Sequence, residues 1–187
     1  MKRAIIVHGW SDTPEGSWFP WLKRKLEEKG FRVDVPEMPD TNIPKIDAWV
    51  KKLEETIGKP DKDTFLVGHS IGCQAIMRYL EKANAKVGGI LFVAGWFTLK
   101  GLGKEEQIVV KPWLETQINT DQVRNSAGKT IAIFCDNDPY VPITNAETFK
   151  KRLGCETITV TGKGHFTAED GVTELPEALE AVLKLSR

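Results

Sequence analysis

The stretch Gly68-His69-Ser70-Ile71-Gly72 decides how this chain folds, because it joins a buried strand to a helix through a sharp turn. The residues before it, Thr64–Val67, form a short apolar and β-branched run typical of a strand covered on both faces. The residues after it, Ile71–Ala83, place apolar side chains at helical spacing. A Gly-x-Ser-x-Gly pattern at such a junction predicts a nucleophilic serine. A plain glycine-flanked turn is the alternative that this pattern alone leaves open.

The two glycines of this stretch have a physical reason. A serine held in a strained backbone conformation at a sharp turn crowds the residues two positions away, where Gly68 and Gly72 stand without a Cβ. The helix that begins just beyond the serine would aim the Ile71 N–H toward a negative charge formed there. The stretch therefore predicts a nucleophile, Ser70, and one donor of an oxyanion hole.

Length and charge argue for one domain without a polyanionic partner. The chain has 187 residues, enough for one full core, with 26 basic and 26 acidic side chains. A balanced charge offers no footprint for nucleic acid or for an anionic membrane surface. We therefore expect no nucleic-acid partner and no membrane partner.

The first apolar run and the cysteines indicate a cytoplasmic protein. Residues 4–7 are too few for the apolar core of a signal peptide, and no stretch approaches the length of a membrane span. Cys73, Cys135 and Cys155 are odd in number and widely scattered, which predicts reduced thiols in the core. Three histidines without a close cysteine or histidine partner make a structural zinc site unexpected.

Strand and helix patterns alternate along the chain. Six strands are predicted, at Ala4–Val7, Phe31–Val35, Thr64–Val67, Gly89–Ala94, Thr130–Phe134 and Thr157–Val160. Five helices are predicted, at Trp18–Lys29, Ile43–Ile57, Ile71–Ala83, Ile143–Leu153 and Glu174–Leu185. Apolar strands separated by helices predict a three-layer, doubly wound α/β sandwich. We expect a six-stranded parallel sheet in the order 2-1-3-4-5-6, within one domain over residues 1–187.

Residues 95–128 break this alternation. The interval is longer than a usual connection and carries Trp96, Phe97 and Trp113. It predicts a short lid-like insertion, and the alternative is a loop and helix whose aromatic side chains plug the end of the sheet. We interpret the three aromatic residues, with Trp10, as candidate walls of a shallow substrate pocket.

The serine hydroxyl needs a base, and only one histidine follows it in the chain. His165 comes after the last predicted strand, at the edge where parallel sheets place their functional groups. We therefore expect His165 to be the base. His8 and His69 are interpreted as structural, and the position of His69 in the turn predicts that it faces away from the nucleophile.

The carboxylate that orients the base is expected in the loop after the fifth predicted strand. Asp136 and Asp138 both qualify by position. We favour Asp138, because the two prolines that follow it would stiffen the orienting group. Asp136 remains the alternative, since aspartates in such sequences often serve only the turn. Glu169 and Asp170 lie too near His165 in the sequence and are expected to cap the final helix.

The order serine, aspartate, histidine resembles that of the α/β-hydrolase superfamily. Within it, the chain is similar to the small single-domain serine hydrolases related to the retinoblastoma-binding hydrolase and its bacterial counterparts. The motifs that carry the resemblance span nearly the whole chain: His8-Gly9-Trp10, Trp18-Phe19-Pro20-Trp21, Gly68–Gly72, Asp138-Pro139-Tyr140-Val141-Pro142 and Gly164-His165-Phe166.

The resemblance implies a minimal α/β-hydrolase that lacks the first antiparallel strands of larger relatives. It also implies catalytic roles for Ser70, Asp138 and His165, which match the family's triad. Retinoblastoma binding is not implied, because the nearest match to a Leu-x-Cys-x-Glu motif, residues 153–157, ends in threonine.

The expected activity is hydrolysis of small carboxylic esters through an acyl-enzyme on Ser70, without a metal or organic cofactor. These residues do not separate carboxylesterase activity from thioesterase, amidase or peptidase activity. Gly9 would let the chain turn so that the Trp10 N–H joins the Ile71 N–H in the oxyanion hole, and a core-packing turn is the alternative there. A non-catalytic protein-binding or scaffold protein on a hydrolase fold is the rival function. A protein partner is possible in this reading, but no residue pattern supports one.

Overall fold

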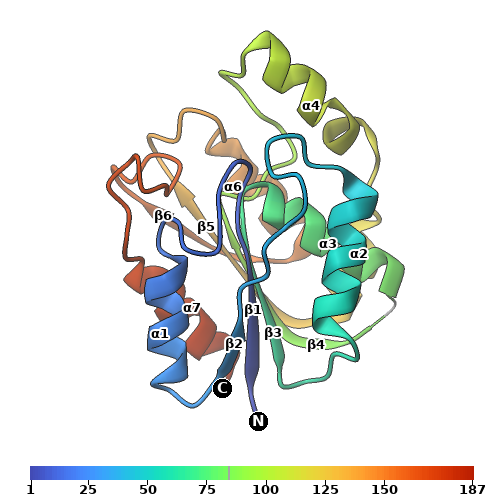
Figure 1. Ribbon diagram of the computed structural model, residues 1–187, viewed down its shortest axis with the longest axis vertical. Helices are drawn as coiled ribbons and strands as arrows, with labels where there is room; N and C mark the ends of the chain where they lie inside the picture. Colours follow the sequence, from blue (N-terminus) through green and yellow to red (C-terminus); the bar gives the residue numbers. More distant parts are fainter. Residues whose placement is uncertain (84) are drawn as a thin grey trace.

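Six parallel strands form the central sheet, in the spatial order β2-β1-β3-β4-β5-β6 (Figure 1). The computed structural model describes residues 1–83 and 85–187. The strands are β1 (Arg3–Val7), β2 (Arg32–Asp34), β3 (Thr64–His69), β4 (Val87–Val93), β5 (Ala127–Cys135) and β6 (Glu156–Val160). Every neighbouring pair is parallel, so the carboxyl ends of the strands lie at one edge of the sheet. The predicted strand order is confirmed.

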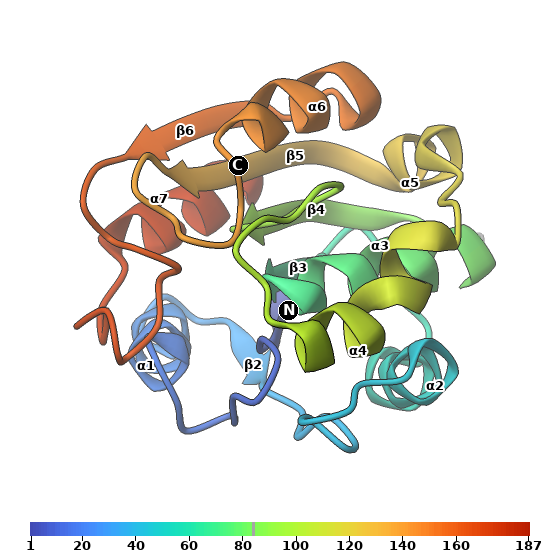
Figure 2. The ribbon, with the colours of Figure 1, turned by 90° about the horizontal axis from the view of Figure 1, so that it is seen from above.

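Helices cover both faces of this sheet, which completes the predicted three-layer sandwich. They are α1 (Phe19–Glu27), α2 (Ile46–Ile57), α3 (Ile71–Ala83), α4 (Lys104–Glu115), α5 (Thr120–Ser126), α6 (Thr144–Leu153) and α7 (Pro176–Leu185). One face carries α1 and α7, the other carries α2, α3, α5 and α6, and α4 stands above the carboxyl edge (Figure 2). Within the described residues, no helix combines the length and apolar character that a membrane crossing requires.

The core lies on both faces of the inner strands. All six residues of β3 are buried, as are the last five of β5. Side chains on both faces of such strands meet helices, which explains why they read as continuous apolar runs in the sequence. The edge strand β6 has no fully buried residue.

Two predicted helices begin two or three residues later than expected, and proline explains both. Ile43 precedes Pro44, and a residue before proline disfavours the helical conformation, so α2 begins only at Ile46. Leu175 likewise precedes Pro176 and is not helical, at φ −138° and ψ 80°, so α7 does not begin at Glu174. Ile43 is therefore a loop residue at the carboxyl edge of the sheet.

The interval predicted as an insertion contains two helices and is shorter than expected. Since β5 begins at Ala127, the last two residues of 95–128 belong to the strand. Trp113 is buried, and its Nε1–H donates to the Pro44 carbonyl at 2.9 Å. Arg78 of α3 donates to the Trp113 and Thr116 carbonyls at 2.7 and 2.9 Å, which ties down the carboxyl end of α4.

The amino-terminal half of α4 is exposed. Whether it moves as a lid stays a prediction.

The turn after β3 has no room for side chains at its two glycines. A Cβ on Gly68 would lie 2.8 Å from the backbone N of Cys73. A Cβ on Gly72 would clash with the Val7 carbonyl oxygen and lie 2.8 Å from that of His8. Helix α3 therefore begins in direct backbone contact with the end of β1.

Gly72→Ala should destabilise the fold, because the β1 backbone cannot move aside without disturbing the sheet. Overpacking of this kind costs about 1–3 kcal/mol. Gly103→Ala is the matched control, since φ there is −66° and the nearest atom would lie 3.4 Å from the new Cβ. Urea unfolding of both variants checks the prediction, and equal midpoints for the two would contradict it.

Candidate active site

Ser70 stands at the turn between β3 and α3 with a backbone φ of 52°, a conformation that side chains rarely adopt. Its backbone N–H donates to the Val93 carbonyl at 2.9 Å, which fixes the turn against the end of β4. The residue is 8% exposed, at the floor of a cavity. The turn therefore presents the hydroxyl to any molecule that enters this cavity.

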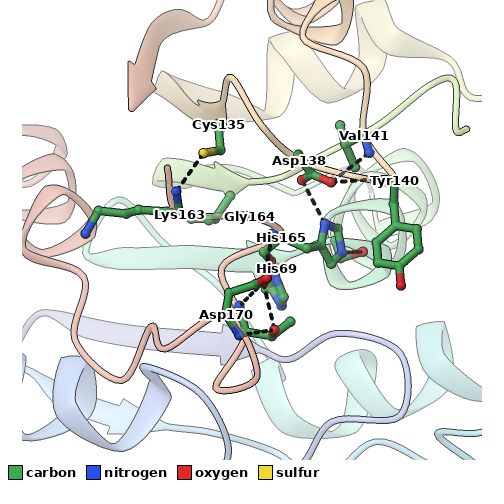
Figure 3. Close-up of polar contacts among 12 residues, drawn as sticks. His69, Cys135, Asp138, Tyr140, Val141, Lys163, Gly164, His165 and Asp170 are labelled. Carbon is green, nitrogen blue, oxygen red and sulfur yellow. Dashed lines mark hydrogen bonds and ion pairs between the residues drawn. The ribbon is translucent and has the colours of Figure 1, made fainter. Parts of the chain in front are cut away.

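Ser70, His165 and Asp138 meet in one hydrogen-bonded chain. Ser70 Oγ lies 2.9 Å from His165 Nε2, and His165 Nδ1 lies 2.8 Å from Asp138 Oδ2. Both distances are those of well-formed hydrogen bonds. Figure 3 shows the imidazole of His165 held against the Asp138 carboxylate. The structure thus brings together the three side chains singled out in the sequence, from the loops after β3, β5 and β6.

Asp138 sets the tautomer of His165. Its Oδ1 accepts the Tyr140 and Val141 backbone N–H groups at 2.8 and 2.9 Å, and its side chain is 1% exposed (Figure 3). A carboxylate only accepts hydrogen bonds, so His165 Nδ1 carries the proton and Nε2 is left as an acceptor. The Ser70 hydroxyl then donates to Nε2, which is the geometry a general base requires.

Asp136, the alternative carboxylate, has a different task. Its Oδ1 accepts the Gly162 N–H at 3.0 Å, and this hydrogen bond holds the pKa of the Asp136 carboxyl below its usual range. The hydrogen bond to His165 Nδ1 comes from Asp138. The geometry therefore favours Asp138 as the orienting group.

The loop after β5 and the loop after β6 are joined by a ladder of side-chain contacts. Residues 135–138 each accept a hydrogen bond from one of residues 162–165. These bonds are Lys163 N–H to Cys135 Sγ at 3.1 Å, Gly162 N–H to Asp136, Gly164 N–H to Asn137 Oδ1 at 2.9 Å, and His165 Nδ1–H to Asp138. The ladder places the His165 backbone as well as its ring.

Asp170 anchors His165 from the opposite direction, a role that the sequence analysis missed. Its Oδ2 accepts the His165 N–H at 2.8 Å and the Thr167 N–H at 3.1 Å (Figure 3). The expectation that Glu169 and Asp170 cap the final helix is wrong, because α7 begins at Pro176 and Leu175 occupies its N-cap. An aspartate five residues after the histidine was the available signal.

Two further rings pack on His165. The Tyr140 ring lies 5.3 Å away and nearly perpendicular, and the His69 ring lies 5.1 Å away. His69 Nε2–H donates to the His165 carbonyl at 2.8 Å. Burial, aided by the nearby His165 imidazole, lowers the pKa of His69 to about 3, so the ring stays neutral. The expectation that His69 faces away is corrected, since its ring packs on that of the base, His165.

Two residues that line the cavity with Ser70, Trp10 and Ile71, have backbone N–H groups without an internal partner in the described part of the chain. Among the described residues, neither the Trp10 nor the Ile71 N–H donates to a protein acceptor. His8 is buried and structural in its contacts: its Nδ1 lies 2.9 Å from the Gly9 carbonyl, and its Nε2 accepts the Met38 N–H at 3.2 Å. Burial lowers the pKa of His8, which keeps this ring neutral. The turn at Gly9 thereby leaves Trp10 at the edge of the cavity.

The cavity above Ser70 has a volume of about 840 Å³, larger than the shallow pocket predicted. Trp10 and Trp96 line it, as expected. Phe97 and Trp113 do not, and these two predictions are wrong. Phe97 packs on Phe149, with ring centroids 5.0 Å apart, and Trp113 is in the core, 1% exposed. The two aromatics pack the insertion onto helices, Phe97 onto α6 and Trp113 onto Trp49 of α2.

The three thiols are buried. Cys73, Cys135 and Cys155 are free, and burial raises the pKa of Cys73 and brings that of Cys155 to about 11. Within the described residues, no group of three His, Cys, Asp or Glu side chains is arranged to hold a metal ion. Ser70 is therefore the nucleophile that the site offers.

A doubly wound parallel sheet with a serine at a strained strand-to-helix turn, beside a histidine and a buried carboxylate, defines an α/β-hydrolase. A profile of the serine hydrolase family matches residues 4–184, and the chain belongs to this family. It is accordingly an enzyme of the hydrolase class. The predicted family resemblance is confirmed.

The chain is similar to proteins named as hydrolases. The putative hydrolase YdeN of Bacillus subtilis is 29% identical over 177 residues, covering 94% of this chain and 91% of that protein. The crystal structure of the ydeN gene product matches with a TM-score of 0.91 at 27% identity, over 99% of this chain and 98% of that one. Serine hydrolase RBBP9 of Rattus norvegicus is 26% identical over 171 residues, covering 88% of this chain and 87% of that protein.

A more distant structure shares the fold. Est1E from Butyrivibrio proteoclasticus, solved with ferulic acid bound, has a TM-score of 0.76 at 16% identity, over 99% of this chain and 89% of that one. At this identity the likeness concerns the fold alone.

Acidification should destabilise the protein between pH 6.5 and about 3. Unfolded His69 takes up a proton near pH 6.5 whereas the folded ring stays neutral until about 3, so its contribution is present above 6.5 and is lost as the pH falls. His8 acts in the same direction. Each histidine lowers the free energy of unfolding by up to about 1.4 kcal/mol for each pH unit of acidification in its window.

His69→Gln, which keeps an N–H donor for the His165 carbonyl, should lessen this decline. Urea unfolding at pH 7, 6, 5 and 4 gives the slope for both proteins. Parallel slopes would show that His69 protonation plays no part.

Proposed function

We propose that this enzyme hydrolyses small carboxylic esters by two-step acyl transfer, with Ser70 as nucleophile, His165 as general base and acid, and Asp138 as the orienting carboxylate. The observation that carries the proposal is the continuous hydrogen-bonded chain from Ser70 Oγ through His165 to Asp138. A structural role alone gives no reason for a strained, cavity-facing serine whose hydroxyl meets the unprotonated nitrogen of a histidine.

Acylation begins when Ser70 Oγ attacks the ester carbonyl carbon. His165 Nε2 takes the hydroxyl proton as the new C–O bond forms, and Asp138 stabilises the resulting imidazolium. The carbonyl oxygen becomes an oxyanion, for which the free Trp10 and Ile71 N–H groups are the proposed donors. Collapse of the tetrahedral intermediate breaks the ester bond, and His165 returns its proton to the leaving alcohol.

Deacylation repeats the sequence with water in place of serine. His165 Nε2 removes a proton from the water, which attacks the acyl carbon, and the same two N–H groups hold the second oxyanion. Proton transfer back to Ser70 Oγ releases the carboxylic acid. The atoms balance with ester and water alone, so the scheme needs no metal or organic cofactor.

The family of the chain and one of its structural neighbours favour an ester substrate. The family is that of serine hydrolases. Est1E, a structural neighbour of the same fold, is solved with ferulic acid, a carboxylic acid, bound. Ester hydrolysis yields such an acid, and it demands less of the leaving group than amide hydrolysis does.

Ser70→Ala should lower kcat for a p-nitrophenyl ester by about 10⁴-fold or more, because the acyl acceptor is gone. A fluorophosphonate probe should label the wild-type protein and fail to label this variant. Ser186→Ala, at the far end of the chain, is the control and should be labelled like the wild type. An unlabelled wild-type protein, or a labelled Ser70→Ala variant, would overturn the assignment.

The two aspartates of the β5 loop can be told apart kinetically. Asp138→Asn leaves an amide that favours the wrong His165 tautomer, so kcat should fall by about 10²–10⁴-fold. Asp136→Asn keeps an oxygen acceptor for the Gly162 N–H and should cost less than about tenfold. Steady-state kinetics on one ester compares them, and a larger loss in Asp136→Asn would reverse the roles.

A further inference from the structure

The cavity above Ser70 is larger than a short acyl ester needs. If each ligand atom takes at most the about 30 Å³ of a water molecule, its volume of about 840 Å³ holds on the order of 25 non-hydrogen atoms. Much of its wall is apolar: lining side chains include Ile43, Leu99, Leu102, Ile108, Val109 and Tyr140. Such a wall rewards an apolar ligand in proportion to the area that it buries.

Exposed apolar side chains gather at the mouth of this cavity. Ile108 is 73% exposed, Ile43 60% and Tyr140 38%, and all three line it. They come from α4, from the loop after β2 and from the loop after β5. Large apolar side chains left open to water from three separate segments mark a binding surface.

The position of His165 determines which part of a bound ester faces the apolar wall of the cavity. In the proposed mechanism His165 must protonate the leaving alcohol, so the alcohol lies on the side of the His165 loop. The acyl group then points the other way. Helix α4 and the segment after β6, which carries His165, lie on opposite sides of the end of β3 (Figure 2). The acyl group is thereby directed toward α4.

The charge around the cavity disfavours an anionic acyl group. Four carboxylates line it: Asp12, Glu105, Glu106 and Glu169. No lysine or arginine appears among the described residues that line it. Glu105 and Glu106 stand in the first turn of α4, beside the apolar wall. A negative charge at the far end of the acyl group would meet like charge without a counter-ion.

We propose that the acyl group of the substrate is an uncharged alkyl chain of about six to ten carbons that lies along the inner side of α4. This inference rests on the proposed function, because it assigns the acyl side of the same reaction. It replaces the expectation of a shallow pocket with that of a larger pocket with a largely apolar wall.

The test is a series of p-nitrophenyl esters from acetate to decanoate, hydrolysed by the wild-type enzyme. Because the leaving group is constant, only the acyl chain changes along the series. Each added methylene should raise kcat/KM by at most about three- to fourfold, which corresponds to about 0.8 kcal/mol. Between acetate and octanoate, kcat/KM should rise by at least about 100-fold. Mono-p-nitrophenyl adipate, with a carboxylate at the end of its six-carbon acyl group, should react at least about tenfold more slowly than the hexanoate.

Two variants of α4 locate the effect. Ile108→Asp puts a charge on the proposed wall at a site exposed enough to leave folding intact, and it should lower the octanoate-to-acetate ratio of kcat/KM by about tenfold or more. Leu114→Asp is the matched control: it is also exposed and also on α4, but it does not line the cavity, and the ratio should stay unchanged.

The outcomes separate this inference from the function on which it rests. A flat series, a preference for acetate, or equal effects of the two α4 variants would overturn the inference while ester hydrolysis itself stood. A preference for the adipate would overturn its charge component. No turnover of any ester, together with no fluorophosphonate labelling, would overturn the proposed function and the inference with it.

Discussion

The hydrogen bond between Ser70 Oγ and His165 Nε2 joins residues 95 positions apart, and it exists only because the parallel sheet ends its strands at one edge. The turn between β3 and α3 fixes Ser70, while the loop after β5 and Asp170 fix His165 from two directions. His69, the neighbour of Ser70, also binds the His165 carbonyl. The base is therefore tied to the nucleophile through its backbone as well as through its ring.

The cost of this arrangement is concentrated where the function lies. Among the described residues, six non-glycine residues have positive φ, and all of them stand in loops after the carboxyl ends of strands: Ser11, Ser17, Asp40, Ser70, Ala94 and Phe166. Backbone strain of this kind persists only where the surrounding structure enforces it. At Ser70, the buried sheet and the backbone contact between α3 and β1 enforce the strained conformation. The same contacts leave no room for a side chain at Gly68 and Gly72.

The fold and the three central side chains could be predicted from the sequence because their signals are local or follow chain order. Apolar runs gave the strands, and a single downstream histidine left no competitor for His165. The choice of Asp138 over Asp136 rested on neighbouring prolines, whereas the structure separates the two by which one reaches the imidazole. Phe97, Trp113, His69 and Asp170 were misjudged because their roles depend on contacts with distant elements. An aromatic residue in a loop reads alike whether it lines a cavity or plugs a core.

In the proposed mechanism, the acyl group of the substrate is transferred to Ser70 before water removes it. The most direct measurement is intact-protein mass spectrometry after rapid mixing with a p-nitrophenyl ester and acid quench, followed by peptide mapping. The proposed mechanism predicts a transient mass increase equal to the acyl group, carried by the peptide that contains Ser70 and decaying as product forms. An acyl group found on another residue would contradict the mechanism. A burst of p-nitrophenol without any covalent species on the protein would contradict it as well.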